Sequence, residues 1–211
     1  PLPKTSVVID KSRVEDDSDD GEIIVHGPGV MQGYLNKPDK TNAVLVPKNK
    51  SGWPGYRTGD RGRLDKEGFL FITGRFKEEY KLLNGKYVHP ASIEESMKLI
   101  PWLANAFVYG DGKKYNVALI YLEFEELPEY AESLGITGDV SNYDAFISNE
   151  DAVNKIKHEI TEKLTGKYGG YEIPRKYKFI KDEFTVESGL LTQTLKLKRP
   201  KVVEKYKDEL E

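Results

Sequence analysis

The chain has 211 residues, 38% of them hydrophobic, and its 32 basic and 35 acidic side chains give a formal net charge of −3. This balance provides no overall positive field to attract nucleic acid, and the absence of cysteine excludes disulfides, thiol catalysis and thiolate metal sites. The apolar runs are too short to cross a bilayer, so the only membrane contact that we expect is peripheral.

Residues 1–74 are expected to form a small β-rich subdomain. Gly, Pro, Asn and Asp recur every few positions, and short β-branched or aromatic runs lie between them, namely Val7–Ile9, Glu22–Val25 and Phe69–Ile72. The acidic stretch Glu15–Gly21 has Asp and Ser at alternate positions, as calcium loops do, but its twelfth position is Gly27, where a bidentate glutamate is needed. We therefore expect a solvated hairpin loop there.

Residues 75–211 mix helical and strand patterns and are expected to form a small α+β domain. A helix is indicated after Pro90, with Glu94 and Glu95 in its first turn, where the helix dipole favours acidic side chains. A hairpin is expected next, with strands at 105–109 and 116–123. It is followed by a helix with Val153, Ile156, Ile160 and Leu164 on one face and Gly166 at its end, and then by a strand at 177–180. A last helix starts at Pro200 and has Val203, Tyr206 and Leu210 on its apolar side.

Two short motifs place an acidic and a basic side chain at the two ends of one β-rich segment. The first is Tyr56-Arg57-Thr58-Gly59-Asp60, and the second, Gly74-Arg75, brings Arg75 fifteen residues after Asp60. A carboxylate can accept hydrogen bonds from both ribose hydroxyls, and a guanidinium offers several fixed donors for a sugar or a phosphate. The alternatives are an ordinary turn in which Asp60 makes an Asx hydrogen bond, and a surface salt bridge for Arg75.

Three other groups of residues could be functional or structural. Asn84-Gly85 is a common hairpin turn on structural grounds alone. The run Lys196–Arg199 could be a basic patch beside a helix, and without interleaved aromatic residues or a net positive domain it does not favour nucleic acid. The three histidines lie in different elements without metal-like spacing, so we expect no metal site in this chain.

In this order the motifs resemble those of the adenylate-forming acyl-CoA synthetases, the superfamily of firefly luciferase and of peptide-synthetase adenylation domains. The spacing from Arg75 to Gly85, followed by Tyr87-Val88-His89-Pro90 and Ile93-Glu94-Glu95, resembles the long-chain fatty acyl-CoA synthetases. So does the segment Gly189–Arg199, in which only Gln193 departs from the pattern of that group. With the segment Gly21–Tyr34 added, the resemblance spans essentially the whole chain.

The resemblance implies a role for each candidate residue. Asp60 and Arg75 would hold the ribose of ATP, and Lys77 would be the hinge about which a small domain swings between two poses. The residues implied along the passage for the pantetheine of CoA are Lys81, Asn84, Gly85 and Lys86. Lys196 would be the catalytic lysine that reaches the acyl carboxylate and the α-phosphate. Lys198 is the alternative, because this ending does not superpose cleanly on the commoner Ser-Gly-Lys pattern.

The resemblance also implies a domain organisation. Residues 1–74 would be the β-rich end of the AMP-binding domain, and residues 75–211 a mobile α+β lid domain. The family's phosphate-binding loop and acyl pocket lie upstream of the first motif, and no such loop precedes Gly21. We therefore expect the C-terminal portion of a longer ligase that is inactive by itself, with the N-terminal domain of the same polypeptide as its partner and the Mg²⁺ ligands outside this chain.

The intact enzyme, expected in the cytoplasm, would convert a fatty acid, ATP and CoA into acyl-CoA through acyl-AMP. One alternative is an adenylating enzyme that passes the acyl group to a carrier protein or to another acceptor. A second alternative is a non-catalytic docking module, in which the 13 tyrosines would supply aromatic interface contacts.

Overall fold

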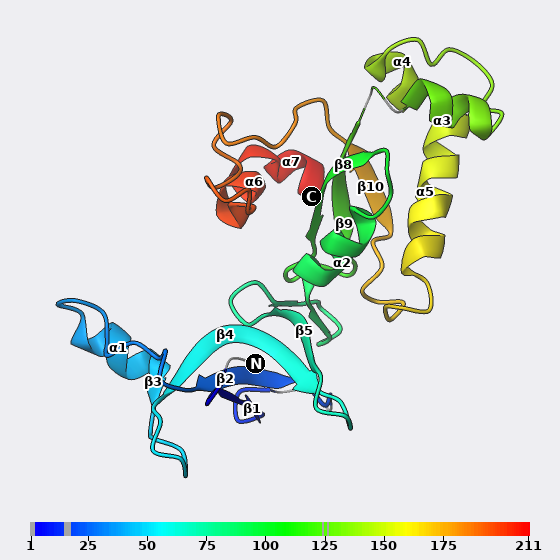
Figure 1. Cartoon of the computed structure of the whole chain (residues 1–211). Helices are drawn as coiled ribbons and strands as arrows, with labels where there is room; N and C mark the ends of the chain where they lie inside the picture. The colour runs from blue at the N-terminus through cyan, green and yellow to red at the C-terminus, as the bar shows by residue number, and fades with distance from the viewer. Residues whose placement is uncertain (1–2, 15–17, 124, 126) are drawn as a thin grey trace. The chain divides into compact units, whose positions relative to one another are not determined.

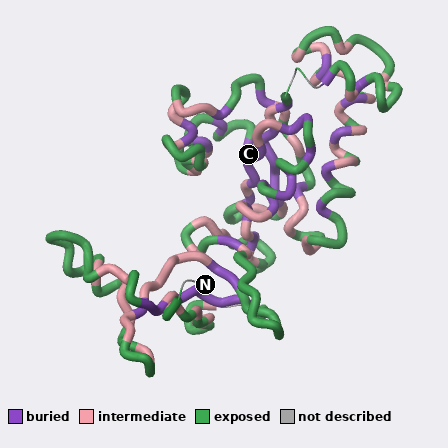
Figure 2. Tube along the Cα trace, viewed as in Figure 1, coloured by how far each residue is buried: buried purple, intermediate pink, exposed green. Residues whose placement is uncertain are grey.

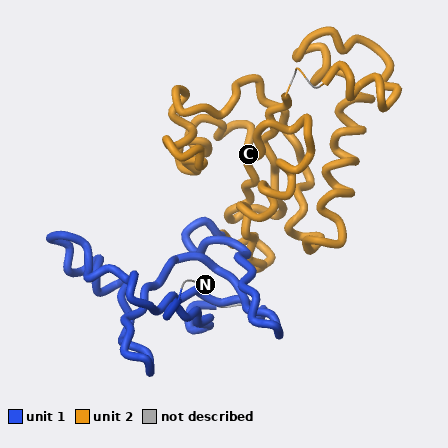
Figure 3. The backbone as a smooth tube through the Cα atoms, in the orientation of Figure 1, with its two compact units in different colours: residues 1–79 blue, residues 80–211 orange. Residues whose placement is uncertain are grey.

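The computed structural model of the protein describes residues 3–14, 18–123, 125 and 127–211. It separates into two compact units, Pro1–Glu79 (unit 1) and Tyr80–Glu211 (unit 2), coloured blue and orange in Figure 3. Helices and strands are both abundant and partly segregated, so the α+β class expected from the sequence is confirmed.

Unit 1 is built on one antiparallel sheet (Figure 1). Its strands in spatial order are β1 (Ser6–Asp10), β2 (Gly21–His26), β4 (Gly55–Leu64) and β3 (Leu45–Val46), and β5 (Leu70–Arg75) pairs with β4. A short helix, α1 (Pro38–Val44), begins at a proline, which suits the first turn because the N–H that proline lacks has no partner there. The three runs expected as strands overlap β1, β2 and β5, which confirms those predictions.

Strand β4 carries the Tyr56–Asp60 motif and is 10 residues long. Two glycines that suggest a turn in the sequence lie inside this strand. Gly59 has a φ of +74°, which favours glycine, and a Cβ at Gly62 would lie 2.3 Å from the carbonyl oxygen of Phe71. The ladder with β5 also shifts register between Arg61 and Gly62, as at a β-bulge. The motif is therefore part of an irregular strand, and the ordinary-turn alternative is wrong.

The acidic stretch before β2 is only partly the solvated loop that the sequence predicts, and its residues 15–17 lie outside the described part of the chain. Asp20 is 8% exposed and accepts hydrogen bonds from Thr73 Oγ1 at 2.6 Å, from Arg63 Nη1 at 3.3 Å and from Arg61 Nε at 3.4 Å. The prediction is wrong for Asp20 because β4 and β5 bring it donors that are 41 to 53 residues away in the sequence.

Unit 2 contains a three-stranded sheet in the order β10-β9-β8. Strands β8 (Leu103–Tyr109) and β9 (Val117–Leu122) form the antiparallel hairpin that the sequence predicts, and β10 (Lys176–Phe179) pairs with β9 in parallel. A separate ribbon joins β6 (Tyr80–Lys81) to β7 (Tyr87–Val88). The helices are α2 (Pro90–Met97), α3 (Leu127–Ser133), α4 (Tyr143–Ser148), α5 (Glu150–Leu164), α6 (Arg199–Lys205) and α7 (Lys207–Leu210).

The two faces of the β8–β9 hairpin pack into different hydrophobic cores. Val108 and Ile120 belong to a core that includes residues of α2 and α5. Phe107 and Leu119, one position away along each strand, point to the opposite face and pack with residues of α6 and α7. Because both faces are buried (purple in Figure 2), the run Val117–Leu122 is almost continuously apolar.

The predicted helix with Ile156, Ile160 and Leu164 on its buried face is confirmed as α5, and Gly166, with a φ of +79°, follows its C-terminal cap. In α2, which begins at Pro90, no acidic residue lies in the first turn. The prediction that Glu94 and Glu95 complement the helix dipole there is therefore wrong.

The last helix is interrupted at Tyr206 into α6 and α7, and it buries Val202 where the sequence pattern favours Val203. The sequence pattern does not predict α3 and α4. Within the described ranges, none of the helices combines the length and the apolar character that a membrane crossing requires.

Candidate functional site

Asp60 and Arg75 face each other across β4 and β5. They are direct partners in the antiparallel ladder, and Arg75 Nε and Asp60 Oδ1 form an ion pair of 2.9 Å. Thr58 fixes the strand just before them, since its hydroxyl donates to the Ile23 carbonyl at 2.8 Å and accepts from the Asp60 N–H at 3.0 Å. The side chains of Asp60 and Arg75 are 27% and 49% exposed. A ligand can therefore reach both.

Two other residues of the same motif are engaged by their neighbours. Arg57 donates to the carboxylates of Asp10 and Glu22, so its guanidinium ties β4 to β2 and β1. The Tyr56 hydroxyl lies 3.4 Å from that of Tyr34. This hydrogen bond, together with burial, raises the pKa of Tyr56, so the phenol stays neutral at physiological pH.

Lys77 lies exposed in the turn that follows β5. The Glu79 N–H donates to the Arg75 carbonyl at 3.2 Å, and the Phe76 N–H donates to the Gly59 carbonyl at 3.1 Å. The turn is therefore bonded to β4 and to the end of β5, and the division between the two units follows it directly.

Gly85 lies in the loop between β6 and β7. The Leu82 N–H donates to the Lys86 carbonyl at 2.9 Å, the Gly85 N–H donates to the Leu82 carbonyl at 2.9 Å, and Gly85 has a φ of +82°. These are the features of a three-residue hairpin loop whose last position is left-handed. Asn84 holds the loop, because its side-chain oxygen accepts from the Lys86 N–H at 3.0 Å.

Lys81, the last residue of β6, and Lys86, which follows Gly85, lie next to tyrosine rings. Lys81 Nζ is 4.9 Å from the centroid of the Tyr87 ring, and Lys86 Nζ is 5.9 Å from that of Tyr171. Lys81, Asn84, Gly85 and Lys86 are all exposed. The loop thus presents positive charge and aromatic surface to the solvent.

Lys196 lies in a tight loop just before α6. The Thr192 N–H donates to the Lys196 carbonyl at 2.8 Å, and the Lys196 N–H donates to Thr192 Oγ1 at 3.1 Å. Leu195 has a φ of +57°, which is costly for a residue with a Cβ. Lys196 is exposed. Lys198, the alternative, is the residue that precedes α6, and its N–H donates to the Leu190 carbonyl at 2.8 Å.

A buried ion pair that the sequence analysis did not identify joins α2 to α6. Arg199, the first residue of α6, donates through Nη2 to Glu94 Oε2, and Glu94 Oε1 accepts from the Val108 N–H at 2.7 Å. Burial raises the pKa of Glu94, and the guanidinium of Arg199 opposes that effect. The two residues lie 105 positions apart, and nothing in the spacing of their motifs links them.

The candidate residues fall into two sets. Asp60, Arg75 and Lys77 belong to unit 1, and the others, Lys81, Asn84, Gly85, Lys86 and Lys196, belong to unit 2. The structure brings Asp60 and Arg75 into direct contact and gathers the residues around Gly85 in one loop.

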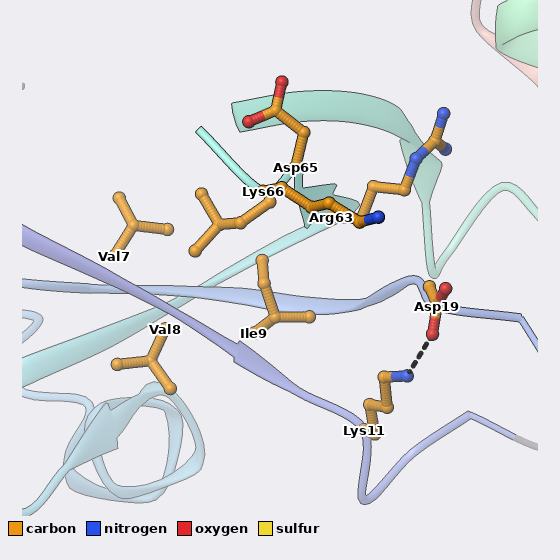
Figure 4. Close-up of a pocket in the computed structure, with 9 residues that line it drawn as sticks. Val7, Val8, Ile9, Lys11, Asp19, Arg63, Asp65 and Lys66 are labelled. Carbon is orange, nitrogen blue, oxygen red and sulfur yellow. Dashed lines mark hydrogen bonds and ion pairs between the residues drawn. The ribbon is translucent and has the colours of Figure 1, made fainter. Parts of the chain in front are cut away.

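A hollow on unit 1 contains none of these residues (Figure 4). Residues of β1 and of the end of β4 line it, and Lys11 Nζ and Asp19 Oδ1 form an ion pair of 3.1 Å at its edge. In the part of the chain that the structure describes, no three His, Asp or Glu side chains are grouped as a metal site requires.

No protein-family model matches the chain. Among curated proteins, it is 34% identical over 204 residues to the long-chain-fatty-acid–CoA ligase ACSBG1 of Rattus norvegicus, an alignment that covers 89% of this chain and 28% of the relative. It is 36% identical over 196 residues to long-chain-fatty-acid–CoA ligase 6 of Homo sapiens, covering 91% of this chain and 27% of the relative. It is 32% identical over 194 residues to the long-chain-fatty-acid–CoA ligase FadD15 of Mycobacterium tuberculosis, covering 92% of this chain and 31% of the relative. The chain thus spans less than a third of the length of these relatives.

Solved structures show the same relationship. The adenylation domain of a carboxylate reductase from Mycobacterium chelonae superposes with a TM-score of 0.70 at 26% identity, over 98% of this chain and 30% of that protein. The O-succinylbenzoate CoA synthetase of Bacillus subtilis, solved in complex with AMP, gives a TM-score of 0.60 at 26% identity, over 96% of this chain and 34% of that protein. The chain therefore belongs to the adenylate-forming superfamily and, within it, to the long-chain fatty acyl-CoA synthetases.

Proposed function

We propose that this chain forms the C-terminal part of an AMP-forming long-chain fatty acid–CoA ligase. The observation that carries the proposal is the accessible cross-strand pair of Asp60 and Arg75, held at 2.9 Å in a chain whose curated relatives are ligases of this class. Because the chain spans 27–31% of the length of those relatives, the activity would belong to a longer protein, and the chain alone would be inactive.

The reaction would proceed in two steps. An oxygen of the fatty acid carboxylate attacks the α-phosphorus of ATP, the bond from phosphorus to the bridging oxygen breaks, and pyrophosphate leaves. The thiol sulfur of CoA, having lost its proton, then attacks the acyl carbon, and the bond from that carbon to the AMP oxygen breaks. A carboxylate is a poor acylating agent until one of its oxygens becomes part of a good leaving group, which is what the first step provides.

Asp60 and Arg75 would bind the ribose of ATP in both steps. The Asp60 carboxylate retains acceptor positions after the contact with Arg75, and the guanidinium retains donors for a sugar oxygen or a phosphate. Lys196 would place its ammonium near the acyl carboxylate and the α-phosphate, where negative charge accumulates during the attack. Its exposure and its position in a loop support this role.

The two units would have different duties. Unit 1 would be the β-rich end of the AMP-binding domain, and unit 2 a mobile lid that presents Lys196 for the first step and the Gly85 loop for the second. Lys77, in the turn before the division between the units, would be the hinge, because an exposed charge there can stay solvated as the backbone rotates. Lys81, Asn84, Gly85 and Lys86 would line the passage for CoA.

The remaining partners would be supplied by the rest of the polypeptide. Mg²⁺ bound with ATP would offset the phosphate charge, and its ligands, like the phosphate loop and the acyl pocket, would lie in the N-terminal domain.

Fatty acid-dependent exchange of pyrophosphate into ATP by the full-length protein tests the adenylation step directly. We expect exchange that rises from short to long fatty acids, and formation of a CoA thioester when CoA is added. Exchange without a CoA thioester would point to a carrier protein or another acceptor. The absence of exchange with every carboxylate tested would leave a non-catalytic docking module.

Replacing Gly85 by alanine should slow the CoA step selectively. Its left-handed backbone costs about 1–2 kcal/mol for a residue with a Cβ, and the loop would relax away from that geometry. We expect pyrophosphate exchange to stay within about twofold and thioester formation from preformed acyl-AMP to fall by about tenfold. The matched control is Gly68→Ala in the β4–β5 turn, where φ is +86° and the strain is similar. Equal effects of the two variants on the thioester step would contradict the assignment of the loop.

A further inference from the structure

The ion pair between Glu94 and Arg199 is the most completely enclosed charge pair of unit 2 among the residues described. The side chains are 4% and 17% exposed. Both carboxylate oxygens are used, one by Arg199 and the other by the Val108 N–H. The guanidinium also lies over the Phe107 ring, 5.2 Å from its centroid, and Nη1 donates to the Val108 carbonyl at 3.4 Å. A single pair thus ties α2, β8 and the first residue of α6 together.

Apolar side chains could fill the volume that Glu94 and Arg199 occupy. Removing two ions from water is costly, and a buried ion pair is often no better for stability than apolar side chains of the same volume. What the pair does provide is direction, because a carboxylate and a guanidinium that meet in a fixed geometry define where each backbone lies. The backbone at issue is that of Arg199.

The loop that contains Lys196 ends at Arg199, whose position the ion pair fixes. Between them the chain makes a narrow two-stranded turn, in which Leu191 pairs with Leu197 and the Lys198 N–H donates to the Leu190 carbonyl at 2.8 Å. Two residues, Leu197 and Lys198, lie between Lys196 and the buried anchor Arg199, while no hydrogen bond or ion pair among the described residues holds the Lys196 ammonium itself. The position of Lys196 is therefore set by the base of its loop.

We infer that Glu94 and Arg199 are positioning residues for Lys196: the buried pair fixes the base of the Lys196 loop, so that the lysine reaches the site of adenylation in one geometry. This inference rests on the proposed function. It predicts that the pair matters for the step that uses Lys196 and not for the step that uses the Gly85 loop.

The test replaces Glu94 by glutamine in the full-length protein and compares the two half-reactions. A displacement of about 1 Å in a catalytic group can lower a rate by about 100-fold. We expect the rate of pyrophosphate exchange to fall by about 10- to 100-fold, and the fall should be in kcat and not in KM. Thioester formation from preformed acyl-AMP should stay within about threefold of the wild type. The matched control is Glu95→Gln, on the same helix, where the side chain is 74% exposed and forms an ion pair with Lys98. It should leave both steps unchanged.

A second variant and a structural measurement separate positioning from loss of folding. Arg199→Lys keeps the positive charge but loses the fork of donors, and it should reproduce the selective loss. In the full-length protein, Glu94→Gln should speed amide hydrogen exchange at Lys196 and Lys198 by about tenfold without changing amide hydrogen exchange in Val117–Leu122. Faster exchange in both segments, or equal losses in both half-reactions, would overturn the inference in favour of a structural role.

The outcomes also distinguish this inference from the proposed function. Wild-type protein that shows no pyrophosphate exchange, together with the selective change in hydrogen exchange, would overturn the ligase assignment and leave the anchoring intact. The opposite outcome is a wild-type protein that shows pyrophosphate exchange, with Glu94→Gln and Arg199→Lys as active as Glu95→Gln. This outcome would overturn the anchoring and leave the ligase assignment intact.

Discussion

Replacing Lys196 by alanine in the full-length protein is expected to reduce fatty acid-dependent pyrophosphate exchange by about 10²- to 10³-fold. The loss of one preorganised donor to developing charge typically has an effect of this size. Because Lys196 is exposed and its ammonium makes no ion pair among the described residues, the substitution should leave the stability of unit 2 nearly unchanged. Formation of the CoA thioester from preformed acyl-AMP should continue, because that step would use a different set of residues.

Lys198→Ala is the matched comparison, since Lys198 is also exposed, lies two residues away and precedes the same helix. If Lys196 is the catalytic lysine, Lys198→Ala should retain exchange within about threefold of the wild type. The reverse pattern would transfer the catalytic role to Lys198. Full exchange in both variants would remove the catalytic lysine from this loop altogether.

Replacing Asp60 by alanine is expected to lower kcat/KM for ATP by about 10- to 100-fold. A hydrogen bond to a charged group contributes about 1.5–3 kcal/mol, and each 1.4 kcal/mol is a factor of ten. The stability of unit 1 should change by less than about 1 kcal/mol, because the ion pair with Arg75 is partly exposed and such pairs contribute little. Kinetics and thermal unfolding of the same variant measure both quantities.

The ribose contact itself can be isolated with 2′-deoxy-ATP. If Asp60 accepts from the 2′-hydroxyl, the wild type should prefer ATP over the deoxy substrate, and Asp60→Ala should lose most of that preference. Glu67→Ala, an exposed acidic residue in the β4–β5 turn, is the control and should keep the preference. A preference that persists unchanged in Asp60→Ala would exclude the ribose assignment.

The sequence predicted those parts of the fold in which local pattern and tertiary context agree. The β8–β9 hairpin was predictable because Val117–Leu122 is almost continuously apolar and a Gly-Asp-Gly turn precedes it. Strand β4 was not, because Gly59 and Gly62 suggest a turn, and only pairing with β2 and β5 on both sides makes them part of a strand. Local propensity carries no information about such neighbours.

The two missed helices, α3 and α4, are short and lack a long apolar period. For α4 a signal was present in the sequence: Asn142 caps the helix by accepting from the Ala145 N–H at 2.9 Å. Asn149 likewise accepts from the Ala152 N–H at 3.1 Å and begins α5. Each asparagine stands three residues before the alanine whose N–H it accepts from. Treated as two N-caps, Asn142 and Asn149 would have predicted that α4 and α5 are separate helices.

The candidate site was predictable where its residues stand in motifs that lie close together in the sequence. Asp60 and Arg75 were paired on sequence grounds and are ladder partners in the structure. The pair of Glu94 and Arg199 was not predicted, since the two residues stand in separate motifs that the sequence does not connect. Its burial depends on a helix that begins 105 residues later, and no local pattern encodes that meeting.

The order in which the chain is synthesised gives this ion pair a further consequence. Until Arg199 has left the ribosome, Glu94 lacks the guanidinium that in the folded unit opposes the rise of its carboxyl pKa on burial. The face of the hairpin with Phe107 and Leu119 is also uncovered until α6 and α7 follow. Unit 2 is therefore expected to complete its folding only after Arg199 emerges, and nascent chains arrested before that residue should bind chaperones that recognise exposed apolar strands.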